Sequence, residues 1–257
     1  MSGQAGRRVC VVTGSSSGIG AATVLWFAQR GHDVVINYSR DPEPANAVAE
    51  RCRAAGADVL VLRADIADNT QCLALAEEVG QRWGGADVLV NNAGTASKAT
   101  DIKDLDALSA GDFEACYAVN VIGTFQMSRA MAPLMKGRAN AAIVNISSMA
   151  ALMGTGSSIA YAASKGALNT LTLSLARSLA PAIRVNAILP GMVDSDWLRK
   201  RLGADQFQAR RERYEARALL KDVITPDDVA RTAWWLAADA VKVTGQLIQL
   251  DAGFMLG

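Results

Sequence analysis

The 257-residue sequence predicts a doubly wound α/β domain, in which helices cover both faces of a parallel sheet. Short β-branched runs alternate with Ala/Leu-rich stretches along the chain, an order typical of right-handed crossovers between parallel strands. Several runs, such as VCVV and AAIVNI, are continuously apolar, as expected of strands that are buried on both faces. No repeat, low-complexity tract or linker interrupts this order. We therefore expect one domain, residues 1–257, with a seven-stranded sheet.

The individual elements follow from the same patterns. The expected strands are Val9–Thr13, Val34–Tyr38, Val59–Arg63, Asp87–Asn91, Ala142–Ser147, Ile183–Leu189 and Gln246–Leu250. The expected helices are Ile19–Arg30, Ala45–Ala55, Thr70–Trp83, Asp112–Met135, Ser158–Leu179 and a last one after residue 222. Gly31 and Gly56 end the first two helices, because glycine readily adopts the left-handed conformation that follows a helix. The charged stretch 194–222 is interpreted as a helical insert over a site.

Composition limits the function classes. The 26 Lys and Arg residues nearly balance the 25 Asp and Glu residues, which argues against nucleic acid or an anionic membrane as a partner. No apolar run reaches the roughly 18 residues that span a bilayer, and the N-terminus lacks the apolar core of a secretory signal. The four cysteines form no C-x-x-C pair. We expect a cytoplasmic protein with reduced thiols.

The chain contains a single histidine, His32. It follows Gly31 and precedes an apolar run, so it is predicted to lie in a surface turn. A single histidine in such a turn argues strongly against a Ser-His-Asp triad and leaves no multi-histidine metal site. We expect no metal, and acid–base chemistry must use another residue type.

A glycine-rich segment joins the first strand to the first helix. It reads Thr13-Gly14-Ser15-Ser16-Ser17-Gly18-Ile19-Gly20. Such a turn lets the backbone approach a phosphate, and the helix N-terminus offers it free N–H groups. Gly18 and Gly20 could instead serve only helix–strand packing. The position after the first strand of a parallel sheet favours a dinucleotide site and a Rossmann fold.

The residues after the second strand bear on the choice of cofactor. NAD sites usually place an acid there to bind the ribose 2′-hydroxyl, but the sequence reads Tyr38-Ser39-Arg40. Ser39 and Arg40 could bind a 2′-phosphate, since a guanidinium binds phosphate through two parallel hydrogen bonds. NADP(H) is therefore favoured. NAD(H) stays possible because Asp41 is adjacent, and Arg40 could also be a solvated surface residue.

The best candidate for proton transfer is Tyr161, followed one helical turn later by Lys165. Residues four apart share a helix face. An ammonium group beside a phenol favours the phenolate and lowers the phenol pKa. Such a tyrosine can act as a general acid toward a carbonyl or as a general base toward an alcohol. The alternative is a surface Tyr and Lys that are merely neighbours.

The motifs together carry a resemblance. TGSSSGIG, then NNAG at residues 91–94, Asn120, Ser148 thirteen residues before Tyr161, YAASK and Pro190-Gly191 occur in this order. The sequence resembles the short-chain dehydrogenase/reductase family over essentially its whole length, and within it the 3-oxoacyl-acyl-carrier-protein reductases. Each motif alone is weak, but several in the right order are specific.

The resemblance implies a catalytic tetrad. Tyr161 would be the acid/base, Lys165 would lower its pKa and bind the nicotinamide ribose, and Ser148 would polarise the substrate carbonyl. Asn120 would interrupt its helix and hold a water that links Lys165 to solvent. The implied contacts of the pyrophosphate are Gly14, Ser16, Ser17, Gly18, Ile19 and Gly20. The adenosine ribose would be contacted by Tyr38, Ser39 and Arg40, the adenine by Asp65 and Ile66, and the region nearby by Asn92, Ala93 and Gly94, of which Asn92 is largely structural. The nicotinamide would be contacted by Pro190, Gly191, Val193 and Ser195, beside Tyr161 and Lys165. Asp65 could equally cap the next turn, although Asp68 is the better cap for the helix at Thr70.

The implied reaction is hydride transfer between nicotinamide and a ketone or secondary alcohol. Substrate identity would depend mainly on the insert, where residues 197–221 hold eight Lys and Arg against three acids. This basic segment could attract a carrier-bound 3-oxoacyl thioester, or it could be a solvated helical face. A sugar or general alcohol dehydrogenase and a non-catalytic dinucleotide-binding regulator are the alternatives. Family members usually form tetramers, so a homotetramer acting on a small molecule is expected.

Overall fold

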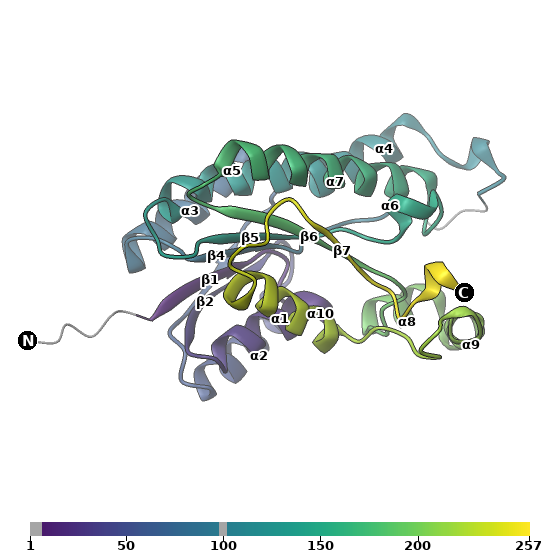
Figure 1. The fold of residues 1–257 in the computed structure, drawn as a ribbon, viewed down its shortest axis with the longest axis horizontal. Helices are drawn as coiled ribbons and strands as arrows, with labels where there is room; N and C mark the ends of the chain where they lie inside the picture. Colours follow the sequence, from purple (N-terminus) through teal and green to yellow (C-terminus); the bar gives the residue numbers. More distant parts are fainter. Residues whose placement is uncertain (1–6, 98–101) are drawn as a thin grey trace, which may run out of the picture.

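The computed structural model describes residues 7–97 and 102–257. It shows one parallel sheet between two layers of helices (Figure 1). The strands are β1 (Arg8–Val12), β2 (His32–Tyr38), β3 (Val59–Arg63), β4 (Val88–Asn91), β5 (Ala142–Ile146), β6 (Arg184–Pro190) and β7 (Leu247–Leu250). Their order in the sheet is β3-β2-β1-β4-β5-β6-β7. The predicted seven-stranded Rossmann fold is confirmed. The strand order reverses between β1 and β4, which is where sheets of this kind bind ligands beyond the carboxyl ends of the strands.

Each face of the sheet has its own helical layer (Figure 1). One layer holds α1 (Gly18–Ala28), α2 (Pro42–Ala54) and α10 (Pro226–Trp234), and the other holds α3 (Asn69–Trp83), α5 (Thr124–Met135) and α7 (Ile159–Leu179). Alternate residues of a strand point to opposite layers. Val34 of β2 therefore joins the apolar cluster that contains Phe27 of α1, whereas Val35 joins the cluster that contains Met127 of α5. This double burial explains the continuously apolar runs.

The predicted helix over residues 112–135 is interrupted in the structure. It divides into α4 (Ala110–Tyr117), a π-helical turn at Ala118–Gly123, and α5. The remaining helical elements of the described residues are α6 (Ala150–Met153), α8 (Asp196–Leu202), α9 (Ala204–Arg217), Leu105–Ala107, Trp235–Asp239 and Phe254–Leu256. π-Helical turns often mark functional sites. This one contains Asn120, the residue expected to interrupt its helix.

The prediction that His32 lies in a surface turn was wrong. His32 is the first residue of β2 and is buried, with its ring 5.2 Å from the ring of Phe27 and 5.3 Å from that of Trp234. Burial, aided by the positive charge of Arg8, lowers the pKa of His32 to about 4. Trp234 comes from α10, about two hundred residues away in the chain. The sequence around His32 therefore does not reveal that Trp234 packs against it.

The helical insert expected at residues 194–222 is present as α8 and α9, beside the carboxyl ends of β6 and β7 (Figure 1). It has a small apolar cluster of its own, which includes Met192, Phe207 and Tyr214. Among the described residues, no helix combines the length and apolarity that crossing a membrane requires.

Candidate functional site

The loop after β1 has the backbone conformation that its glycines permit. Gly14 has φ +60°, and a Cβ on it would lie 2.9 Å from the Cα of Ala93. A Cβ on Gly20 would lie 2.5 Å from Nδ2 of Asn92. Asn92 in turn donates hydrogen bonds of 3.0 Å to the carbonyl groups of Thr13 and Gly14. Asn92 thus fastens the loop after β4 to the loop after β1, in agreement with its expected structural role.

The N-terminus of α1 is open to a ligand. Ser17 occupies the N-cap position, but its side chain makes no capping hydrogen bond, and the first turn contains no acidic residue. Gly18 has φ +53°, and a Cβ there would meet none of the described atoms within 4 Å. The amide groups of this first turn therefore lack side-chain acceptors, as an anion site at a helix N-terminus requires.

Asn37 of β2 organises the loops around this site, although the sequence did not single it out. Its Oδ1 accepts a 3.0 Å hydrogen bond from the amide of Gly14, and its Nδ2 donates to the carbonyl of Ala64 at 3.0 Å. Its own amide donates to Oγ of Ser15. The available signal was an asparagine directly after the apolar run Val34-Val35-Ile36, since a buried amide needs several partners.

The residues after β2 and β3 lie at the carboxyl ends of these strands, as expected from the strand assignments. Ser39 and Arg40 are exposed at the carboxyl end of β2. The carboxylate of Asp41 accepts the amide of Glu43 at 3.0 Å and so caps α2. Asp68 caps α3, as expected. Asp65 is exposed and its carboxylate accepts only the amide of Ala67 at 3.0 Å among the described partners.

Lys165 is buried against the end of β5. Its ammonium group donates a 2.8 Å hydrogen bond to the carbonyl of Ile146. Burial lowers the pKa of Lys165 to about 8, because a charged group loses hydration in the interior. Nζ lies 5.7 Å from the ring centre of Tyr161, one turn earlier in α7. The structure therefore brings the two predicted residues together.

Ser148 also lies at the carboxyl end of β5. It follows β5, two residues after the Ile146 carbonyl that holds Lys165, and it is half-buried. Its Oγ accepts the amide hydrogen of Ala150 at 3.1 Å. Tyr161 is also half-buried, and its amide donates to Oγ of Ser158, the N-cap of α7, at 3.1 Å. Strand β5 and the first turns of α7 thus carry the candidate catalytic groups.

Asn120 is buried in the π-helical turn and ties it to two neighbouring segments. Its Oδ1 accepts the amide of Thr95 at 2.8 Å, and its Nδ2 donates to the Thr95 carbonyl and to Oγ of Ser164, each at 2.9 Å. A Cβ built on Gly94 would lie 3.2 Å from Oδ1 of Asn120 and 3.6 Å from Nζ of Lys165. Asn120, Lys165 and the loop after β4 therefore meet at Gly94. Thr95 and Ser164 carried no separate signal in the sequence.

Known proteins share this architecture. The model of a family described as Enoyl-(Acyl carrier protein) reductase matches residues 14–255. A putative ketoacyl reductase 2 of the granaticin polyketide synthase of Streptomyces violaceoruber is 36% identical over 245 residues, 95% of each chain. The 3-oxoacyl-(acyl-carrier-protein) reductase FabG of Thermotoga maritima is 34% identical over 252 residues, 97% of this chain and 98% of that one. The structure of a putative short-chain dehydrogenase/reductase from Burkholderia xenovorans has a TM-score of 0.90 and 45% identity, and covers 99% of this chain and all of its own.

The chain is a short-chain dehydrogenase/reductase. Family membership makes it an NAD(P)-dependent oxidoreductase that resembles 3-oxoacyl-acyl-carrier-protein reductases. An aldohexose dehydrogenase of Thermoplasma acidophilum has the same fold, with a TM-score of 0.85 and 28% identity over 98% of this chain and 95% of that one. The fold alone therefore does not select the substrate.

In this short-chain dehydrogenase/reductase the loop after β6 contacts the helical insert. Val193 pairs with Ile224 as a parallel bridge. The hydroxyl of Ser195 accepts the amide of Leu198 at 3.4 Å and caps α8. A Cβ on Gly191 would lie 1.9 Å from the hydroxyl oxygen of Tyr214 in α9. Tyr214 is a contact of Gly191 that sequence reasoning did not foresee.

Proposed function

We propose that this enzyme uses NADPH to reduce the keto group of 3-oxoacyl thioesters, with Tyr161 as the general acid. The observation that carries the proposal is the buried ammonium group of Lys165, held by the Ile146 carbonyl within 5.7 Å of the Tyr161 ring. The ketoacyl and 3-oxoacyl reductases among its relatives support the substrate class.

The chain offers a site that fits a nicotinamide dinucleotide. The uncapped first turn of α1 fits a pyrophosphate, which Ser16, Ser17 and Ile19 would contact. Arg40 is exposed and suited to a 2′-phosphate, whereas the neighbouring Asp41 carboxylate is engaged in capping α2. The exposed guanidinium supports NADP(H) over NAD(H), because it can bind a phosphate through two parallel hydrogen bonds and because Tyr38, not an acid, ends β2.

The remaining cofactor contacts follow the family pattern. Asp65 and Ile66 would bind the adenine, Ala93 and Gly94 would line the ribose, and Pro190, Gly191, Val193 and Ser195 would surround the nicotinamide. When bound, the cofactor supplies the hydride that reduces the ketone carbon.

The side chains of the tetrad have complementary tasks. The Tyr161 phenol donates its proton to the ketone oxygen. The Lys165 ammonium favours the phenolate that remains, through its positive charge. Because Oγ of Ser148 accepts the Ala150 amide, its hydroxyl proton is available to donate to the same ketone oxygen. Oδ1 of Asn120 accepts one amide hydrogen bond and retains a second lone pair, which can hold a water beside Lys165.

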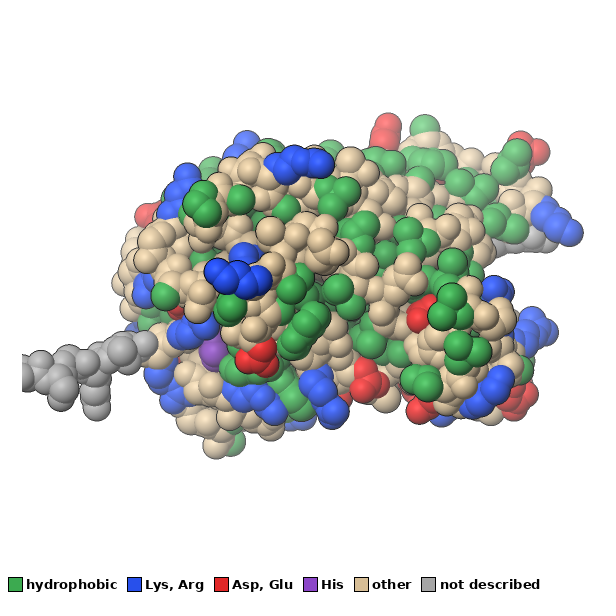
Figure 2. Space-filling view, in the orientation of Figure 1, with side chains coloured by type: hydrophobic (Ala, Val, Ile, Leu, Met, Phe, Trp, Pro, Cys, Tyr) green, Lys and Arg blue, Asp and Glu red, His purple; other side chains and the backbone are tan. Residues whose placement is uncertain are grey.

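The insert would act as the substrate lid. Basic and acidic side chains are mixed on the visible face of the insert (Figure 2), so its charge alone does not select an anionic substrate. The similarity to an aldohexose dehydrogenase favours a second candidate, oxidation of a sugar. A regulator that only binds the dinucleotide has no need of the complete tetrad of Asn120, Ser148, Tyr161 and Lys165.

Self-association is a further part of the proposal. Phe113, Ile122 and Phe125 are exposed apolar side chains on α4, the π-helical turn and α5. Such a patch fits an interface with a second copy, consistent with the expected homotetramer. Sedimentation velocity should give an oligomer, and Phe125→Glu should weaken it; a wild-type species of 27.0 kDa would contradict the proposal.

The test is a substrate panel with both cofactors. Acetoacetyl-coenzyme A, glucose and cyclohexanone are assayed by nicotinamide absorbance with NADPH or NADH, and with the oxidised forms for glucose. We expect acetoacetyl-coenzyme A with NADPH to give the highest kcat/KM. Arg40→Ala should raise the KM for NADPH at least fivefold and leave that for NADH nearly unchanged, whereas Arg53→Ala, on the exposed side of α2, should change neither. Activity confined to glucose, or a preference for NADH, would refute the proposal.

A further inference from the structure

The carboxylate of Asp194 joins the loop after β6 to both helices of the insert. It receives two hydrogen bonds from the Arg199 guanidinium of α8, at 2.8 and 2.7 Å, and one from Arg211 of α9 at 3.0 Å. Only 18% of the Asp194 side chain is exposed, so these charged contacts are partly shielded from water. Bidentate arginine–carboxylate pairs fix orientation as well as charge. Asp194 therefore binds both α8 and α9 from one loop.

The backbone of this loop is held by the other end of the insert. The amide of Asp194 donates to the carbonyl of Ile224 at 2.8 Å, and the amide of Ile224 donates to the carbonyl of Met192 at 2.9 Å. The segment 192–194 is thus paired with the residues that follow α9. The insert and the loop are connected through both side chain and backbone.

Tyr214 adds another attachment at the start of the same loop. Its buried hydroxyl donates to the carbonyl of Asp251 at 2.7 Å and occupies the space where Gly191 lacks a side chain. Its ring stacks on Phe254 at 4.3 Å. Helix α9 is therefore fixed to the carboxyl end of β7 as well as to the loop.

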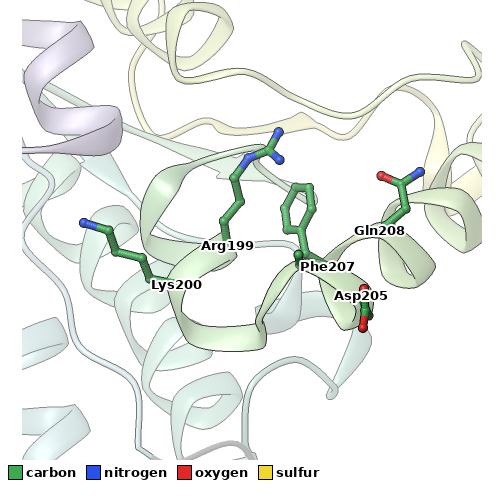
Figure 3. A pocket seen from close by; sticks show the side chains of 6 residues that line it. Arg199, Lys200, Asp205, Phe207 and Gln208 are labelled. Carbon is green, nitrogen blue, oxygen red and sulfur yellow. The ribbon is translucent and has the colours of Figure 1, made fainter.

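The arginines that bind Asp194 differ from Lys200, whose ammonium group makes no hydrogen bond or ion pair within the described part of the chain. In Figure 3 the Arg199 side chain lies beside Phe207, and Lys200 extends in another direction. The guanidinium carbon of Arg199 is 4.3 Å from the Phe207 ring centre. Both side chains border a cavity of about 500 Å³ between α8 and α9. Asp194 and Phe207 together hold Arg199 in place, so its charge serves the connection to the loop.

We infer that Asp194 is a positioning residue that couples the helical insert to the nicotinamide loop, so that nucleotide binding and closure of the insert favour each other. Asp194 lies between Val193 and Ser195, and the inference rests on the proposed placement of the nicotinamide beside these two residues. Coupling of this kind is reciprocal: whatever orders the loop also stabilises the insert, and the reverse. It does not depend on which ketone is reduced or which nicotinamide is preferred.

The experiment measures coupling directly. We first determine whether the wild type binds NADPH or NADH more tightly, and then measure the dissociation constant of that nucleotide by fluorescence. Tryptic cleavage after the exposed Lys200, Arg210 and Arg213 is followed with and without this nucleotide. In the wild type we expect the nucleotide to slow cleavage at least fivefold. In Asp194→Asn the dissociation constant should rise at least fivefold and the protection should fall below twofold.

The matched control is Asp196→Asn, an exposed acid in the first turn of α8, which should keep the wild-type affinity and protection. Asp194→Glu should restore part of the protection because it keeps the charge. Should Asp194→Asn fail to fold, Arg211→Gln removes the partner of Asp194 on α9 and keeps Arg199. This variant should lower the protection to between twofold and fivefold. An unchanged dissociation constant or unchanged protection in a folded Asp194→Asn protein would overturn the inference. An ion pair that only stabilised the insert would raise cleavage equally with and without the nucleotide, and so would leave the protection by the nucleotide unchanged.

Discussion

Replacing Lys165 by methionine should stabilise the protein while abolishing its activity. Burial lowers the pKa of Lys165 from 10.5 to about 8. At about 1.4 kcal/mol per pKa unit, holding the ammonium in the interior costs roughly 3 kcal/mol at neutral pH. Methionine removes this cost but also removes the hydrogen bond to Ile146, a loss of about 1 kcal/mol. The expected gain in the free energy of unfolding is about 2 kcal/mol.

The pH dependence supplies a second readout of the same effect. Below pH 8 Lys165 is protonated in both the folded and the unfolded state, so the full cost applies. Between about pH 8 and 10.5 the folded state loses the proton while the unfolded state keeps it, and wild-type stability should therefore gain a rising contribution with pH. Lys165→Met should lack this contribution.

The assay is urea unfolding followed by tryptophan fluorescence at pH 7 and pH 9.5, with turnover measured on the same preparations. Lys136→Met, an exposed lysine at the end of α5, is the control and should change stability by less than about 0.5 kcal/mol. Turnover of Lys165→Met should fall at least a hundredfold. A variant less stable than the wild type at pH 7 would refute the reasoning, because it would mean that the buried charge is stabilising.

Two further predictions concern the fold around the site. His32, with its pKa lowered from 6.5 to about 4, should make unfolding easier as the pH falls below 6.5, since the unfolded state then takes up a proton that the folded state refuses. The free energy of unfolding should fall by about 2 kcal/mol between pH 7.5 and 5 because of this residue. In urea titrations His32→Phe should lack this contribution to the pH dependence. Equal losses in both proteins would contradict the burial argument. Gly191→Ala should lower the free energy of unfolding by about 1–3 kcal/mol, because its Cβ would meet the Tyr214 hydroxyl. Tyr214→Phe in the same chain should recover part of this loss in thermal melts, and an undiminished stability of Gly191→Ala alone would show that the contact is absent.

Most of the fold could be predicted from local patterns. Each β-branched run became a strand, and Gly31 and Gly56 follow the helices they were expected to end. The glycine loop and the pair Tyr161 and Lys165 depend on short-range spacing, which a sequence displays directly. The family resemblance was confirmed by the comparisons.

What could not be predicted depends on contacts between distant segments. His32 is covered by α10, and Asn37 binds loops that follow two other strands. The interruption at Asn120 was expected, but its form, a π-helical turn tied to Thr95, was not. Likewise, the charges of the insert suggested a surface feature, whereas the structure uses Arg199 and Arg211 to bind Asp194. Sequence composition counts such residues without showing which of them are paired.

The proposed proton-transfer role of Tyr161 is tested most directly by Tyr161→Phe, with NADPH binding and acetoacetyl-coenzyme A reduction measured on one preparation. Removing only the hydroxyl should leave the NADPH dissociation constant within about threefold of the wild type and lower kcat at least a thousandfold, in line with loss of a positioned general acid together with its hydrogen bond to the substrate. A variant that binds NADPH normally and keeps a tenth or more of the wild-type kcat would contradict the account.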